Sequence, residues 1–195
     1  MAALVRRFFD IMLGRNRPIK PKMDQLFALS TAYVTLTVEL GLKPSERAGI
    51  CFRPLASAAF EQLGTDLDRL LDISARTTNT TVQQTQDNYG FKWVVLVDQQ
   101  FEDLVSTIHV FSETLHEEGF GEQLLAAVFR FEEDGRPVYW IYNYKRGAFY
   151  PFVPQPGRTD RRDNAYELRL RAVMSRELPI EQDVERWYPL WGIPV

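Results

Sequence analysis

Apolar residues recur every three or four positions along two stretches of the chain, which is the spacing of an amphipathic helix. The first stretch follows Ser57, a suitable N-cap, and the second covers about 101–118 and ends at Gly119. Further helices are predicted at about 163–176, capped by Asp163 or Asn164, and briefly at about 23–29. The core face of the helix after Ser57 is expected to consist of Phe60, Leu63, Leu67, Leu70 and Leu71.

Runs of β-branched and aromatic residues between turn residues predict strands at 31–40, 49–53, 77–86, 91–97, 123–131, 138–144 and 147–152. The run 77–86 is rich in Thr and Gln, which indicates an exposed or edge strand, and Glu133-Asp134-Gly135 is typical of a hairpin turn. This order predicts an α+β fold: an antiparallel sheet of about five to seven strands with helices packed on it, similar to the secretion-chaperone and YbjN-like folds.

The first 22 residues differ from the rest of the chain. They carry a net charge of +5 against −8 for residues 23–195, and 1–14 has the pattern of an amphipathic helix, followed by a basic, proline-containing linker. We therefore expect residues 1–22 to form a helix and linker, and 23–195 to form a single α+β domain. The helix is too short to be stable alone in water, so its apolar face must be covered by a membrane surface, by a partner or by its own domain. The residues expected to make these contacts are Phe8, Phe9, Met12, Arg15, Arg17, Lys20 and Lys22.

Composition excludes several classes of protein. Cys51 is the only cysteine, so a zinc cluster built from four cysteines and an intrachain disulfide are excluded, and the thiol is expected to be buried. No apolar run approaches the ~20 residues of a membrane span, and no secretory signal is apparent, so a cytoplasmic protein is expected, in contact with the inner face of the membrane through its basic segment. The acidic body argues against nucleic acid as a partner.

The helix at 101–118 carries both histidines, His109 and His116, on one stripe with Glu113 and Glu117. Side chains seven positions apart on a helix are separated by roughly 10 Å, too far to bind one ion directly. No phosphate-binding loop and no nucleophile motif is present. We therefore expect no metal, no cofactor and no catalytic residue, and keep a metal-dependent enzyme using His109, Glu113 and His116 as an alternative.

The segment 142–164 interleaves aromatic residues with cations, a composition that suits an anionic or protein partner. In the alternative interpretation, Tyr142, Phe149 and Phe152 alternate inward as core and the arginines pair with local acids. The candidate partner-binding residues, called the 144–164 surface below, are Tyr144, Lys145, Arg146, Phe149, Tyr150, Arg158, Arg161, Arg162 and Asn164. We expect Glu at both Arg161 and Arg162 to weaken partner binding without unfolding the domain.

Several motifs resemble the PspAB family of PspA-associated proteins. They are Tyr144-Lys145-Arg146-Gly147 continuing to Phe152, Arg161-Arg162-Asp163-Asn164, Phe120-Gly121, Cys51-Phe52-Arg53-Pro54 and Arg186-Trp187-Tyr188-Pro189-Leu190-Trp191-Gly192. The resemblance implies an accessory protein of the phage-shock envelope-stress response, with PspA or a membrane protease of the HtpX type as partner. It supplies no catalytic residues. A further alternative is a protein like the secretion chaperones, which mask a segment of a client and would show an exposed apolar groove and a dimer.

Overall fold

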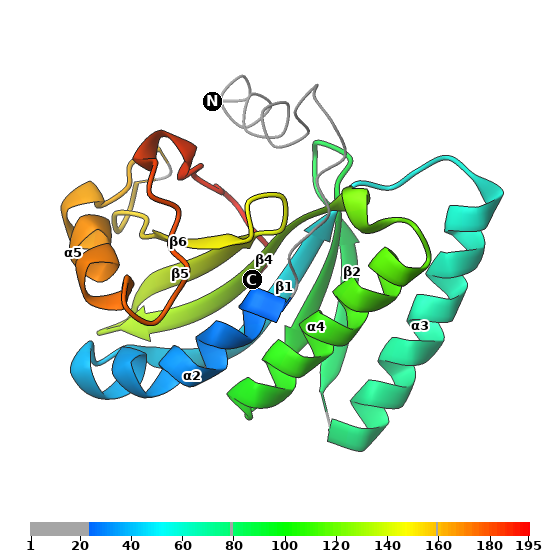
Figure 1. The fold of residues 1–195 in the computed structure, drawn as a ribbon, viewed down its shortest axis with the longest axis horizontal. Helices are drawn as coiled ribbons and strands as arrows, with labels where there is room; N and C mark the ends of the chain where they lie inside the picture. Colours follow the sequence, from blue (N-terminus) through cyan, green and yellow to red (C-terminus); the bar gives the residue numbers. More distant parts are fainter. Residues whose placement is uncertain (1–23, 79, 159) are drawn as a thin grey trace.

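The computed structural model describes residues 24–78, 80–158 and 160–195, and its centre is one six-stranded antiparallel sheet (Figure 1). The strand order is β2-β3-β1-β4-β5-β6, so β2 and β6 are the edges. The predicted α+β class and the strand number are confirmed. The strands are β1 (Lys43–Phe52), β2 (Thr81–Gln86), β3 (Lys92–Val97), β4 (Leu124–Glu133), β5 (Arg136–Asn143) and β6 (Ala148–Phe152).

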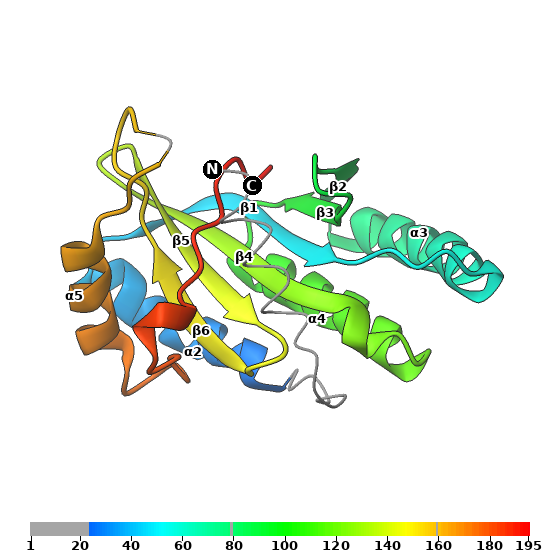
Figure 2. The ribbon, with the colours of Figure 1, turned by 90° about the horizontal axis from the view of Figure 1, so that it is seen from above.

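Four α-helices lie in the described part of the chain, and three of them cover one face of the sheet (Figures 1 and 2). These three are α2 (Ala28–Val34), α3 (Ala58–Thr78) and α4 (Phe101–Glu117). The fourth, α5 (Asn164–Met174), packs beside β6. The chain after α5 crosses the other face, where Trp191 contacts the ring of Phe152. Short turns of 3-10 helix cover Asp24–Phe27, Gly121–Gln123 and Val184–Arg186.

The strand predicted at 31–40 is wrong, because this segment is helical. Helix α2 continues into a π-helical turn, Thr35–Glu39. The β-branched residues of the segment favour a strand, but Leu29, Ala32 and Leu36 are spaced three and four apart and are all fully buried. Burial of this helical stripe against the sheet outweighs the strand propensity, which spans only about 1 kcal/mol per residue.

Local signals fixed most other boundaries. The Ser57 hydroxyl accepts a hydrogen bond from the Phe60 amide at 3.2 Å, and the Asp163 carboxylate accepts one from the Tyr166 amide at 3.0 Å, so both predicted caps are confirmed. Asp134 and Gly135 have φ values of +50° and +80°, as a tight hairpin turn between β4 and β5 requires. Strand β1 starts six residues earlier than the predicted Gly49, at Lys43, because a bulge at Glu46 keeps residues before it paired with β4.

The core lies on both faces of the central strands. On the helix side, Phe101 packs its ring against Phe129 at 5.9 Å and Phe131 at 5.3 Å. On the other side, Cys51 is buried as predicted. Strand β4 is buried along most of its length because helices cover one face and the C-terminal segment covers the other.

Candidate functional site

The aromatic residues of the 144–164 surface lie inside the fold. Tyr144, Phe149 and Tyr150 are fully buried, and the Tyr150 hydroxyl donates to the carbonyl of Tyr188 at 3.2 Å. Burial raises the pKa of Tyr150, which keeps the phenol a neutral donor. The prediction that these three side chains contact a partner does not fit this placement. The alternative interpretation does fit, since its three residues, Tyr142, Phe149 and Phe152, are all buried.

Arg162 also has a structural role, because it connects three parts of the fold. Its Nε donates to both carboxylate oxygens of Glu167, at 2.9 and 2.7 Å, and its two terminal nitrogens donate to the carbonyls of Trp187 and Pro151. Glu167 is only 1% exposed and also accepts from the Val153 amide at 2.7 Å. Arg162 therefore joins α5, the end of β6 and the C-terminal segment, so its replacement should destabilise the domain as well as change its surface charge.

The remaining candidates form two separate groups. Lys145 and Arg146 precede β6, whereas Arg158, Arg161 and Asn164 follow it. A five-residue strand spans about 17 Å, so the groups lie at opposite ends of β6. Arg146 pairs with Glu181 at 2.8 Å, while Arg158, Arg161 and Asn164 are exposed. Partner binding by the exposed members stays a prediction.

The histidine helix does not assemble a metal centre among the described residues, where no three His, Cys, Asp or Glu side chains lie close enough to share an ion. The ring of His109 contacts the ring of Phe27 at 4.3 Å, and its Nε2 lies 3.5 Å from the Glu113 carboxylate. The His109 side chain is only 14% exposed, so most of it is packed within the domain. The predicted membrane or partner contacts, from Phe8 to Lys22, lie outside the described residues.

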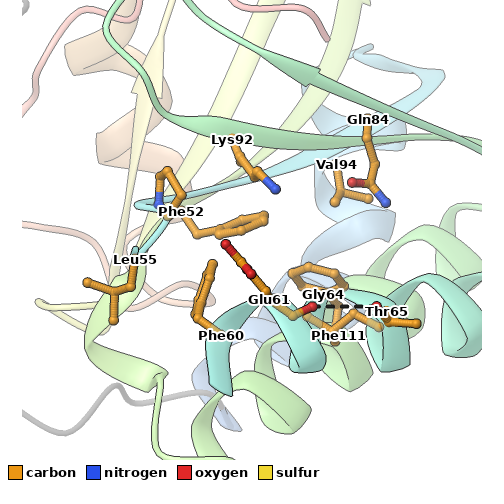
Figure 3. A pocket seen from close by; sticks show the side chains of 12 residues that line it. Phe52, Leu55, Phe60, Glu61, Gly64, Thr65, Gln84, Lys92, Val94 and Phe111 are labelled. Atoms are coloured by element: carbon orange, nitrogen blue, oxygen red, sulfur yellow. Dashed lines mark hydrogen bonds between the residues drawn. The ribbon is translucent and has the colours of Figure 1, made fainter. Parts of the chain in front are cut away.

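A groove between α3 and strands β1–β3 is a further candidate site. It has a volume of about 370 Å³ and opens to solvent. Its floor is aromatic and aliphatic: Phe60 and Leu67 from α3, Phe52 from β1, Val94 from β3 and Phe111 from α4 (Figure 3). The rings of Phe52 and Phe111 lie 5.6 Å apart and those of Phe52 and Phe60 6.3 Å apart, so the floor is a continuous aromatic cluster.

Part of the groove is open because Gly64, in the middle of α3, has no side chain. Phe60, Gly64, Leu67 and Leu71 share one face of the helix at spacings of four, three and four, and this face is turned toward the sheet. A Cβ built at Gly64 would meet no atom within 4 Å. The helix therefore presents an apolar stripe with one side chain missing, and the space opens at that gap.

Four polar side chains line the groove. Glu61 and Thr65 come from α3, Lys92 from the start of β3 and Gln84 from the edge strand β2. Figure 3 shows the Glu61 carboxylate and the Lys92 ammonium pointing into the same opening from opposite walls. No ion pair joins these two described residues, so the opening has a hydrogen-bond acceptor on one wall and a donor on the other.

The edge strand β2 runs beside the groove. Among the strands that the structure describes, β3 is its one partner, and five of its six residues are exposed. The edge position predicted for the Thr/Gln-rich run is confirmed, although the strand begins at Thr81 because α3 extends to Thr78. Sequence reasoning missed the groove itself, since its walls come from segments far apart in the chain. The available signal was the glycine inside an otherwise regular helical pattern.

Fold and site together define an α+β domain with an apolar groove beside the edge strand β2. The chain belongs to the PspAB family: the family model of PspA associated protein B matches residues 6–195, which confirms the resemblance. A comparison with curated proteins gave no match. Within the described residues, no helix has both the length and the apolar character needed to span a bilayer.

Proposed function

We propose that this chain is a non-enzymatic accessory protein of a PspA-type envelope-stress response. It binds a protein partner, PspA or an HtpX-like membrane protease, at the inner face of the membrane. The observation that carries the proposal is the match to PspA associated protein B over nearly the whole chain. The family name implies association with PspA, and the body of the protein supplies surfaces suited to binding.

The arrangement of polar groups supports binding over catalysis. The most strongly held ionic pair, Arg162 with Glu167, is enclosed within the fold and joins structural elements. By contrast, the groove, the free edge of β2 and the exposed apolar residues Val34 and Val38 are accessible to another macromolecule. Accessible apolar surface of this kind is a feature of interaction sites.

The basic segment supports a position at the membrane. Its Lys and Arg residues would each contribute about 1 kcal/mol of attraction to an anionic bilayer surface, and Phe8 and Phe9 would supply apolar contacts. A segment of this kind would bring the acidic body close to membrane-bound PspA without a spanning helix.

Two measurements test the proposal on the full chain. Purified protein should bind purified PspA in biolayer interferometry, and it should float with vesicles containing anionic phospholipid in a salt-sensitive way. Charge reversal at Arg15, Arg17, Lys20 and Lys22 should abolish flotation. Absence of PspA binding at high protein concentration would refute PspA as the partner, and salt-insensitive flotation would refute the electrostatic contact.

A matched charge reversal on the body serves as the control. The Arg158→Glu/Arg161→Glu variant changes exposed residues only and should leave flotation unchanged. The same variant tests the exposed part of the 144–164 surface, because weakened PspA binding would support that surface and unchanged binding would refute it.

A further inference from the structure

We propose that the groove between α3 and strands β1–β3 binds an extended segment of a partner protein. One or two large apolar side chains of that segment fill the groove, and its backbone lies along β2. The inference rests on the proposed function only in taking the partner to be a protein.

The volume of the groove fits side chains better than a large cofactor. A cavity of about 150 Å³ holds a benzene ring, so about 370 Å³ accommodates roughly two aromatic-sized groups. This is near the lower end of the range of small-molecule pockets, about 300–1,000 Å³. The floor of Phe52, Phe60 and Phe111 offers ring edges and faces, which suit an aromatic or a long aliphatic side chain.

Gly64 is hard to explain by packing. Glycine in a helix interior is about 1 kcal/mol less favourable than alanine, and a Cβ at this position would meet nothing within 4 Å. A larger apolar residue here would both strengthen the helix and fill the space. Glycine at position 64 therefore keeps the groove open and makes the helix less stable. Such a loss of stability is expected where the open space binds a ligand.

The charges at the mouth select the chemistry of that ligand. An anion such as a fatty acid would meet the carboxylate of Glu61, and a cation would meet the ammonium of Lys92. A neutral group with a donor at one end and an acceptor at the other satisfies both walls, and the peptide unit is such a group. Charge complementarity therefore favours a polypeptide backbone over a lipid or a nucleotide.

The edge strand gives this backbone a place to bind. In the sheet formed by the described residues, β2 is an edge strand that pairs with β3 on one side, and an extended segment can add along its other side as a seventh strand. Alternate side chains of an added strand point to the same face of the sheet. Gln84 of β2 is one of the residues that line the groove. Side chains of an added strand on the helix side of the sheet would therefore lie next to the groove.

The test uses the full chain and a phage-displayed library of random linear 12-residue peptides. Selection on wild type with counter-selection on Gly64→Phe should enrich peptides with a large apolar residue. Fluorescein-labelled versions of these peptides should bind Gly64→Phe at least 10-fold more weakly than wild type. Gly64→Ala, which adds only a Cβ, should bind within 2-fold of wild type, and Lys92→Glu and Glu61→Lys should each weaken binding several-fold. Urea midpoints for every variant establish that it is folded.

Several results would overturn the proposal. One is that no peptide distinguishes wild type from Gly64→Phe. Another is a wild-type dimer that Gly64→Phe converts to monomers, which would make a second copy the occupant. A third is a 10-fold higher peptide affinity of the Phe8→Ser/Phe9→Ser variant than of wild type. That result would mean that the chain's own N-terminal segment competes with the peptide for the groove.

The same variants separate this inference from the proposed function. Equal binding of PspA by wild type and Gly64→Phe would overturn the groove as the partner site and leave the PspA association standing. Selective peptide binding in the groove without any PspA binding would support the groove and refute PspA as the partner.

Discussion

Replacing Arg162 by Met should destabilise the protein far more than replacing its neighbour Arg161. Arg162 makes two hydrogen bonds to the Glu167 carboxylate and one each to two backbone carbonyls, and Glu167 is 1% exposed. Removing one partner of a buried ion pair typically costs about 3–5 kcal/mol, because the other charge stays buried without compensation. A domain is stable by only about 5–15 kcal/mol, so this one substitution removes a large share of the total.

Urea unfolding followed by circular dichroism measures the effect. With an m value of about 2 kcal/mol per molar urea, a loss of about 4 kcal/mol lowers the midpoint by about 2 M. The exposed Arg161→Met control should change the free energy of unfolding by less than about 0.5 kcal/mol. The cost of Arg162→Met should shrink as the pH falls, because the unpaired Glu167, whose pKa burial raises, can then take up a proton.

A double-mutant cycle isolates the pair. Arg162→Met/Glu167→Gln removes both charges, so it should cost less than the sum of the single changes by about 1–3 kcal/mol. If Arg162→Met shifts the midpoint no more than Arg161→Met, or if the coupling energy is indistinguishable from zero, the structural role assigned to this pair is wrong.

Three further predictions follow from single contacts. Gly64→Ala should raise the free energy of unfolding by up to about 1 kcal/mol in urea titrations, because a Cβ there meets nothing; a loss of stability would show that the space is not open. Gly49→Ala should destabilise by about 1–3 kcal/mol, since its Cβ would lie 2.6 Å from Val195 Cγ2, and adding Val195→Ala should recover part of the loss; additive costs would contradict the clash. Burial raises the pKa of Glu167 above its usual value near 4.5, so the folded state binds this proton more tightly than the unfolded state. The stability of wild type relative to Glu167→Gln should therefore fall as pH rises from about 4.5 through that raised pKa, and a rise over this range would reverse the assigned direction of the shift.

Much of the fold followed from local patterns. The helix after Ser57, the helix before Gly119 and the hairpin at Asp134 and Gly135 were predictable because their signals lie within a few residues of each other. The segment 31–40 was not, because its residue types favour a strand, whereas the apolar spacing that places it on the sheet is carried by only a few residues.

The candidate site was less predictable than the fold. The role of Arg162 depends on carbonyls of Pro151 and Trp187, which no spacing rule connects. The groove depends on which strands face Gly64 across the sheet, and strand order is a property of the whole chain. Interleaved aromatic and basic residues indicated a surface, but both faces of β6 are covered, so the adjacent residues Phe149 and Tyr150 are both buried.

The composition of the β2 edge has a consequence for how the protein behaves at high concentration. Proteins commonly protect free strand edges with lysine, proline or a bulge, and Thr81–Gln86 contains no charged residue and no proline. Two copies can therefore approach edge to edge, and their Thr and Gln side chains offer little repulsion against such pairing. Overproduction of this chain should therefore favour self-association through β2, and a protein that binds along this edge should suppress it. The composition of one short strand would then limit the concentration at which the protein stays dispersed.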